Sequence, residues 1–149
     1  SHLCKYFCGL VERFLCIVDD DVDITNLFYD VLSTIQGIKP FKFTDHTIAL
    51  QHFKDNISSY EKVITDLKIH EMNGIELLST LKDLKPSLRT ILITAFEVND
   101  KIFDEYKSNK IIDLVVQKPI KIQELNKQIS LLIEEVSQQD QSPTITFVK

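Results

Sequence analysis

Short apolar runs alternate with segments of helical periodicity along most of the chain. The runs are typical of buried strands and occupy five segments: residues 14–18, 39–43, 60–65, 89–94 and 111–116. Between and after them, apolar residues recur three and four positions apart. This spacing predicts amphipathic helices over five further segments: residues 24–35, 47–53, 75–84, 98–106 and 122–136. The first helix should end near Gly37 and the third before Pro86.

Strict alternation of strands and helices restricts the fold. Strands separated by single helices pair in parallel through right-handed crossovers, which places helices on both faces of the sheet. We therefore predict an α/β fold, a three-layer sandwich around a five-stranded parallel sheet of the flavodoxin-like, doubly wound (βα)5 type. Residues 14–136 would form this domain. Residues 1–13 would be an N-terminal extension, in part a short helix and in part a cloning remnant of a piece cut from a longer protein, and residues 137–149 a flexible tail or linker.

Composition excludes several classes of protein. The 149 residues are 44% hydrophobic and 26% charged, which suits one globular domain that needs no disulfide or metal to fold. A net charge of -5 without a Lys/Arg cluster argues against nucleic acid or an anionic membrane as a direct partner. Three scattered glycines cannot form a P-loop or a Gly-rich dinucleotide loop. With Cys16 inside an apolar run, and neither an apolar stretch long enough for a membrane span nor a secretory signal, we expect a reduced, cytoplasmic protein.

Candidate functional residues stand directly after the predicted strands. Ligands of open parallel sheets bind beyond the carboxyl ends of the strands. Asp19 and Asp20 follow the first strand, Asp66 follows the third, Thr94 ends the fourth, and Lys118 comes just after the fifth. Two carboxylates brought within about 4 Å would repel by roughly 4 kcal/mol at an effective dielectric constant near 20, so a cation is needed among them. Mg²⁺, which prefers oxygen ligands, fits this need, and Lys118 supplies a second positive charge.

These groups together are those of a phosphoryl-transfer site. A carboxylate that attacks phosphorus forms an aspartyl phosphate, and catalysis then depends on in-line positioning and on stabilising charge at the phosphoryl oxygens. Thr94 can donate a hydrogen bond to one such oxygen and Lys118 can pair with another. The small side chain of Ala95 leaves space for the incoming group.

Residues 14–136 resemble the receiver domain of two-component response regulators. The resemblance rests on four motifs in order: Ile17-Val18-Asp19-Asp20-Asp21, Val63-Ile64-Thr65-Asp66 with Met72-Asn73-Gly74 behind it, Ile93-Thr94-Ala95, and Lys118-Pro119. It implies that Asp66 is the phosphoacceptor. It also implies that Asp19, Asp20, Asp66 and the main-chain carbonyl of Lys68 hold Mg²⁺. Thr94 would be the switch hydroxyl, and the bond between Lys118 and Pro119 would be cis.

The same resemblance implies a role in signalling and not that of an enzyme in its own right, although such a domain assists its own phosphorylation and dephosphorylation. A sensor histidine kinase or phosphotransfer protein would donate the phosphoryl group. The output would run through a downstream protein target or an output domain missing from this chain, with a phosphorylation-dependent homodimer as a further option. The helix face around Val98, Ile102, Phe103 and Tyr106 is a candidate contact surface.

Three places depart from the family pattern. Val115 stands three residues before the family's lysine, where an aromatic switch residue is usual. His70 replaces the usual proline four residues after the phosphoacceptor, and Lys68 and Phe96 occupy the variable positions that flank the phosphoryl site. Val115 and the loop that contains His70 support an alternative function: a pseudo-receiver that acts as a constitutive protein-interaction module without regulated phosphorylation.

Other motif matches are weaker. Asp21 and Asp23 fit the nucleophile motif of haloacid-dehalogenase-like phosphatases, and with Asp19 they copy the first ligands of an EF-hand loop. The phosphatase motif begins one turn too late, and the EF-hand loop lacks its required glycine. We therefore expect Asp21 and Asp23 to cap the first helix instead. Cys4 and Cys8 lack a second ligand pair at zinc-site spacing.

Overall fold

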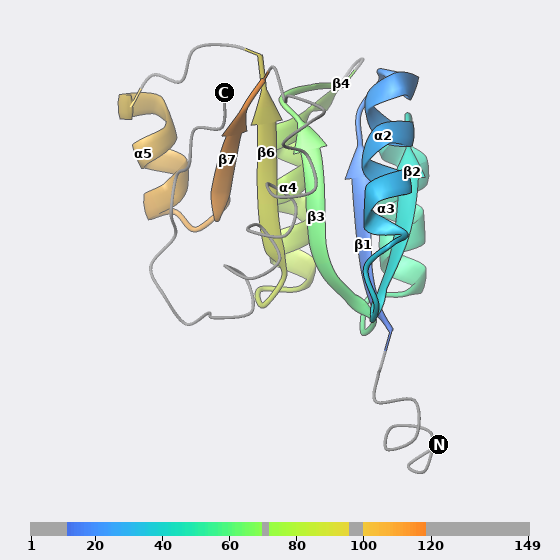
Figure 1. Ribbon diagram of the computed structural model, residues 1–149. Helices are drawn as coiled ribbons and strands as arrows, with labels where there is room; N and C mark the ends of the chain where they lie inside the picture. Colours follow the sequence, from blue (N-terminus) through green and yellow to red (C-terminus); the bar gives the residue numbers. More distant parts are fainter. Residues whose placement is uncertain (1–11, 70–71, 96–99, 119–149) are drawn as a thin grey trace.

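A five-stranded parallel sheet forms the centre of the protein (Figure 1). The computed structural model describes residues 12–69, 72–95 and 100–118. The strand order is β2-β1-β3-β6-β7, and each neighbouring pair is parallel. The strands are β1 (Arg13–Val18), β2 (Ile38–Phe43), β3 (Tyr60–Asp66), β6 (Arg89–Thr94) and β7 (Leu114–Gln117). The chain therefore has the predicted fold class, with the chain reversing its direction of winding at β1 and β3.

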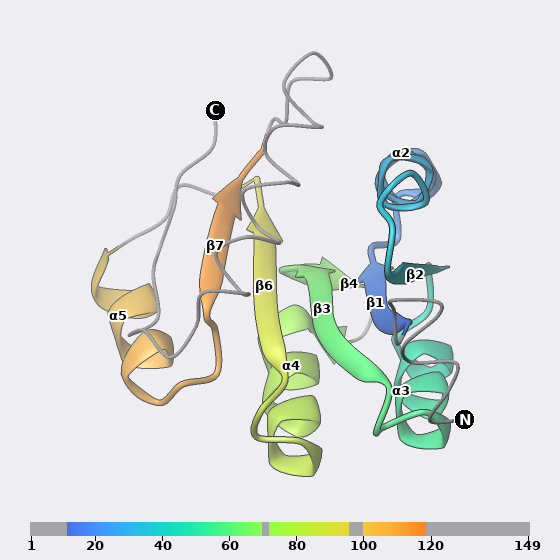
Figure 2. The same ribbon diagram turned by 60° about the horizontal axis from the view of Figure 1, so that its bottom comes forward.

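Helices cover both faces of this sheet. Helix α2 (Val22–Leu32) lies on one face, whereas α3 (His46–Asp55) and α4 (Gly74–Leu84) lie on the other (Figure 2). Helix α5 (Asp100–Ser108) lies beside β7. The three layers arise because the strands β1, β3, β6 and β7 bury successive residues on both sides of the sheet and need cover on both.

The side chains of β1 show how one strand serves both faces. Leu15 and Ile17 enter a core with Phe28 and Leu32 of α2, while Cys16 enters the core beneath α3 and α4. Burial raises the pKa of the Cys16 thiol to about 12, so this cysteine behaves as a small apolar residue, as predicted.

Polar residues set the beginning and end of the first helix. The Asp21 side chain accepts hydrogen bonds from the Asp23 and Ile24 main-chain N–H groups, which confirms the expected cap. The helix ends at Leu32 and not at residue 35. The hydroxyls of Ser33 and Thr34 donate to main-chain carbonyls of the last turn and compete with further helical pairing.

Two local features differ from the sequence-based expectation. A small antiparallel hairpin, β4 (Lys68–Ile69) with β5 (Met72–Asn73), follows β3, and its strands are too short to leave a periodic pattern. The last described strand begins at Leu114 and not at residue 111, because the Asp113 carboxylate accepts from the main chain and hydroxyl of Thr90 on β6.

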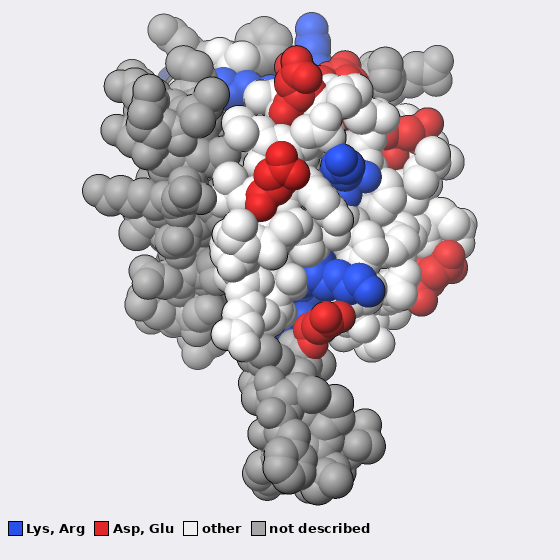
Figure 3. Space-filling model, turned by 45° about the vertical axis from the view of Figure 1, so that its right-hand side comes forward, with Lys and Arg blue, Asp and Glu red and all other residues white. Residues whose placement is uncertain are grey.

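Several predictions lie outside the described residues. They are the N-terminal helix, the helix over 122–136 and the tail, the cis bond after Lys118, and the environments of His70, Phe96 and Val98. Among the helices that are described, none combines the length and apolar character needed to cross a membrane. On the side of the molecule where the edge strand β2 lies, Lys and Arg are interspersed with Asp and Glu (Figure 3).

Candidate functional site

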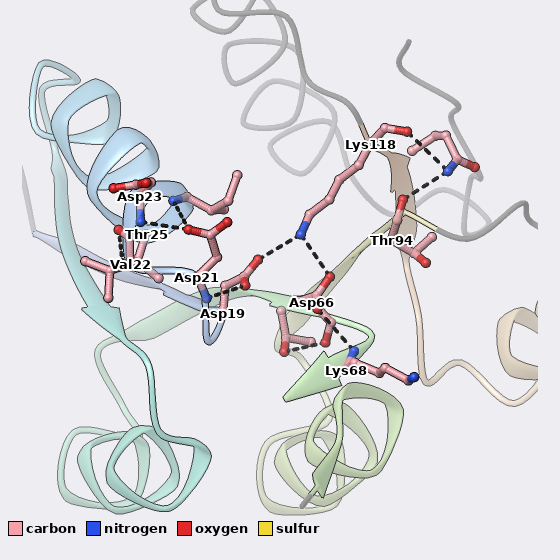
Figure 4. A network of polar contacts seen from close by, with 12 residues as sticks. Asp19, Asp21, Val22, Asp23, Thr25, Asp66, Lys68, Thr94 and Lys118 are labelled. Atoms are coloured by element: carbon pink, nitrogen blue, oxygen red, sulfur yellow. Dashed lines mark hydrogen bonds and ion pairs between the residues drawn. The ribbon is translucent and has the colours of Figure 1, made fainter. Parts of the chain in front are cut away.

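Four strands end at the same edge of the sheet and bring the predicted site residues to it. The register aligns Val18 of β1 with Thr65 of β3, and Asp66 with Ile93 of β6. Thr94, the last residue of β6, aligns with Gln117 of β7. Asp19 and Lys118, the residues that follow β1 and β7, therefore lie at this edge as well (Figure 4).

Three carboxylates form an acidic cluster. Asp19, Asp20 and Asp66 each offer a carboxylate oxygen, and these atoms all lie within 4.8 Å of one another. Asp19 is only 1% exposed, Asp66 is half-buried and Asp20 is exposed. The Asp19 Oδ1 atom accepts a hydrogen bond of 2.9 Å from the Asp21 N–H, which ties the buried carboxylate to the start of α2. The cluster is thus fixed at the buried Asp19 and accessible to solvent at Asp20.

Lys118 bridges the two less exposed carboxylates. Its Nζ atom lies 3.1 Å from Asp19 Oδ2 and 3.2 Å from Asp66 Oδ1, so it supplies the positive charge that their mutual repulsion requires (Figure 4). Burial raises the pKa of Asp19 above its ordinary value, and the Asp21 N–H and the Lys118 charge offset this only in part. Burial alone would lower the pKa of Lys118, but the two carboxylates together outweigh it, and the net shift is upward.

Asp66 is held by its own loop and by α4. Its Oδ2 atom accepts a hydrogen bond of 3.2 Å from the Lys68 N–H. Behind it, Gly74 opens α4, and the Gly74 N–H donates to the Leu67 carbonyl over 2.7 Å. A Cβ atom at Gly74 would lie 2.0 Å from the Asp66 carbonyl oxygen. Only glycine allows the helix to approach the end of β3 so closely. The role of the Lys68 main-chain carbonyl as a metal ligand stays a prediction.

Thr94 completes the edge beside this cluster. It is fully buried, and its carbonyl accepts a hydrogen bond of 2.7 Å from the Lys118 N–H. The same carbonyl accepts from the side chain of Gln117, a contact that the sequence analysis missed. The available signal was a primary amide at the end of the apolar run Leu114-Val115-Val116.

The arrangement suits a hard divalent cation and disfavours the competing motifs. Carboxylate oxygens are the ligands that Mg²⁺ prefers, and the exposed side of the cluster leaves room for water and phosphate oxygens. Asp21 caps α2 and Asp23 lies in its first turn, so neither ends a strand, as a dehalogenase-type nucleophile would. A strand and not a helix precedes them, which is incompatible with an EF-hand.

Fold and site together define a doubly wound α/β domain with an acidic, lysine-bridged pocket at the carboxyl ends of its strands. A family model, the response regulator receiver domain, matches residues 15–130. The chain therefore belongs to the family of response regulator receiver domains. Such domains are signalling modules of two-component systems and bind Mg²⁺ at an acidic pocket.

Individual proteins agree with this assignment. The chain is 29% identical over 87 residues to the serine/threonine-protein kinase RIM15 of Saccharomyces cerevisiae, covering 58% of this chain and 5% of that protein. It is 25% identical over 116 residues to the transcriptional regulatory protein ZraR of Klebsiella oxytoca, covering 78% of this chain and 25% of that protein. The chain thus spans a quarter or less of the length of these two relatives.

Solved structures share the fold. A receiver domain protein from Clostridium thermocellum superposes with a TM-score of 0.68 at 22% identity, covering 84% of this chain and 97% of that one. A CheY-like receiver domain protein from Methanospirillum hungatei gives 0.69 at 21% identity, covering 85% and 98%. CheY in a CheX-CheY-BeF3-Mg complex from Borrelia burgdorferi gives 0.69 at 20% identity, covering 86% and 93%.

Proposed function

We propose that this protein is a phosphorylation-dependent switch of a two-component system. Asp66 would accept a phosphoryl group from a histidine kinase or phosphotransfer protein, and the modification would change the surface offered to a downstream protein or output domain. The observation that carries this proposal is the meeting of Asp19, Asp66 and Lys118, from three separate strand ends, within salt-bridge distance.

The chemistry assigns one task to each side chain. A carboxylate oxygen of Asp66 attacks the phosphorus atom, a new P–O bond forms, and the P–N bond to the donor imidazole breaks with its electron pair returning to nitrogen. The ammonium group of Lys118 stabilises negative charge on a phosphoryl oxygen, and the Thr94 hydroxyl donates to another. The Lys118 ammonium group already lies 3.2 Å from Asp66, and Thr94 ends β6, the strand next to the one that ends in Asp66.

The metal would be held by Asp19, Asp20, Asp66 and the main-chain carbonyl of Lys68. The three carboxylates fit Mg²⁺ because they are oxygen donors of like charge gathered within one ion's reach. When bound, Mg²⁺ would neutralise the carboxylates and the phosphoryl oxygens together. Asp19 is buried and fixed by the Asp21 N–H, which orients one of its oxygens, while Asp20 stays accessible to the incoming ion.

The test is labelling with a small acyl phosphate in the presence of Mg²⁺, followed by mass measurement of the intact protein. We expect one added phosphoryl group, which Asp66→Asn and removal of Mg²⁺ both abolish. Asp23→Asn is the matched control, since this aspartate belongs to α2 and not to the acidic cluster, and it should label like the wild type. Labelling that persists in Asp66→Asn would place the modification elsewhere and contradict the proposal.

A second candidate, the pseudo-receiver, has one observation in its favour. Val115 is fully buried at the place where the family usually carries an aromatic switch residue. A protein that neither forms the adduct nor binds beryllofluoride would be a constitutive interaction module instead. The boundaries of the domain at residues 14 and 136, its partners, a phosphorylation-dependent homodimer and a cytoplasmic location stay predictions.

A further inference from the structure

The last residue of β7, Gln117, joins the two strand ends that carry Thr94 and Lys118. Its side chain is 8% exposed, and its Nε2 atom donates to the Thr94 carbonyl over 3.1 Å and to the Lys118 carbonyl over 3.3 Å. The dashed lines at the Thr94 and Lys118 carbonyls in Figure 4 mark these contacts. One amide group therefore connects the main chains of both residues that would contact the phosphoryl oxygens.

The main chain closes this connection into a ring. The Thr94 carbonyl accepts from the Lys118 N–H over 2.7 Å as well as from the Gln117 amide. Thr94 and Gln117 are register partners at the end of the β6–β7 ladder, and Lys118 is the first residue beyond it. The side-chain amide thus adds a further hydrogen bond between β6 and β7 at the point where their main-chain pairing ends.

Packing alone does not account for a glutamine here. The preceding residues of β7 are Leu114, Val115 and Val116, all buried. A primary amide at the end of such a run loses its hydrogen bonds to water when it is buried. Its burial is therefore favourable only where protein groups replace those hydrogen bonds. The carbonyls of Thr94 and Lys118 are two such partners, which indicates that the glutamine serves to hold these two carbonyls.

The position of the Lys118 main chain matters to the chemistry. A lysine side chain is long and flexible, so the place that its ammonium group reaches depends on where its Cα is fixed. In this protein Nζ lies within 3.2 Å of both Asp19 and Asp66. A displacement of about 1 Å in such a group can slow a reaction by up to about a hundredfold.

We propose that Gln117 is a positioning residue of the phosphorylation site, which fixes the Thr94 hydroxyl and the Lys118 ammonium group at the spacing that a phosphoryl group needs. This inference rests on the proposed function and adds to it a residue outside the acidic cluster. Gln117 acts through Thr94 and Lys118 and need not touch the phosphoryl group itself.

The test compares Gln117→Met with the wild type. Methionine keeps the length and much of the volume of glutamine but cannot donate. Beryllofluoride binding in the presence of Mg²⁺ should weaken by about three- to tenfold, and the half-saturating concentration of an acyl phosphate should rise by the same factor. This is the effect expected from losing one or two neutral hydrogen bonds. Mg²⁺ affinity alone should change far less, because the hydrogen bonds that the variant loses go to the Thr94 and Lys118 carbonyls and not to the three carboxylates. Amide exchange of the Lys118 N–H should quicken while that of Ile91, deeper in β6, stays as before.

Thr90→Val is the matched control. Thr90 is buried on the same strand pair at its opposite end, where its hydroxyl donates to the Ile111 carbonyl over 2.6 Å. This variant should lower thermal stability and leave beryllofluoride affinity unchanged. If Gln117→Met does not fold, Gln117→Asn serves in its place, because its amide is one methylene too short to reach both carbonyls.

The outcomes separate the two proposals. Weaker beryllofluoride binding in the Gln117 variant, with Mg²⁺ affinity and the Thr90 control unaffected, supports the inference. A variant that labels and binds like the wild type overturns the inference and leaves the phosphorylation switch intact. Equal losses in Gln117→Met and Thr90→Val would reduce Gln117 to general packing and also overturn it. A wild-type protein that does not label at all overturns the proposed function first and the inference with it.

Discussion

Asp19 combines two properties that oppose each other. It is 1% exposed, and a buried carboxylate loses hydration that a single lysine at 3.1 Å does not fully replace. Its raised pKa expresses the same imbalance, since burial is the largest cause and exceeds the opposing effect of Lys118. This imbalance is consistent with a binding role for Asp19, and the proposed Mg²⁺ would compensate the buried negative charge.

Replacing this carboxylate should therefore stabilise the protein in the absence of metal. In Asp19→Asn the amide oxygen can still accept from the Asp21 N–H, and Lys118 retains Asp66. Because the folded-state pKa of Asp19 lies above its ordinary value of 3.8, this group favours folding below that pH and ceases to do so as the pH rises through the raised pKa. We expect the free energy of unfolding at pH 7 without Mg²⁺ to rise by about 1 kcal/mol, with the gain vanishing toward pH 4.

Urea unfolding at the two pH values measures this effect. Asp20→Asn is the control, since Asp20 is exposed and its neutralisation should change the free energy of unfolding less. A destabilised Asp19→Asn at pH 7 would mean that the ion pair with Lys118 outweighs the loss of hydration.

Helix α4 and strand β3 approach each other closely at Gly74. Gly74 opens α4 directly behind Asp66, and its N–H bonds to the Leu67 carbonyl. Gly74 → Ala would gain helix propensity, because residue 74 lies in an ordinary helical turn. The Cβ, however, would meet the Asp66 carbonyl at 2.0 Å, and that atom belongs to a strand that cannot simply rotate away.

We expect the close contact to dominate in this variant. Gly74→Ala should lower the free energy of unfolding by about 2 kcal/mol, the usual scale of overpacking, and should slow labelling of Asp66 because its strand end must shift. Thermal or urea unfolding, together with the labelling rate, provides the measurement. Asp83→Ala on the exposed side of the same helix should change neither. Wild-type stability and labelling in Gly74→Ala would show that the strand end yields without consequence.

At the scale of elements, periodicity predicted the strands and helices that are long and apolar. The order of the five strands and the helices α2 to α5 followed from runs such as residues 14–18, because a buried parallel strand has a pattern that nothing else in the chain imitates. The β4–β5 hairpin did not follow, since two residues carry no period. Helix and strand ends near Leu32 and Asp113 shifted because individual side chains, the Ser33 hydroxyl and the Asp113 carboxylate, bond to the main chain.

The meeting of Asp19, Asp66 and Lys118 could be predicted for a topological reason, while the roles of these residues stay predictions. Carboxyl ends of parallel strands meet at one edge, so acidic residues after β1 and β3 and a lysine after β7 had to come together there. The contacts between site and scaffold were not predictable in this way. Gln117 donates to two main-chain carbonyls, and which carbonyls lie within its reach depends on coordinates and not on spacing in the sequence.

Across the whole molecule, several polar contacts that connect helices and loops to the sheet lie at the edge opposite the candidate site. At the amino ends of the strands, Asp113 pairs with Lys82 at 2.8 Å and accepts from the Thr90 N–H at 2.9 Å. Lys85 donates there to the carbonyls of Ile57 and Tyr60. Two apolar cores fill the space on either face. The acidic edge contributes carboxylate repulsion instead, so metal binding there should appear directly as a gain in stability.

Mg²⁺ should raise the melting temperature of the whole protein for this reason. A ligand that binds only the folded state at one hundred times its dissociation constant adds about 2.7 kcal/mol. In a domain of this size that corresponds to about 5–10 °C. Asp20→Ala should lose most of this rise while melting at or above the wild-type temperature without metal, because Asp20 is exposed and adds only charge to the cluster. Scanning calorimetry with MgCl₂ against NaCl of equal ionic strength separates specific binding from screening, and Asp23→Ala should respond to Mg²⁺ like the wild type. A melting temperature that rises equally in both salts would mean that the three carboxylates gather no metal.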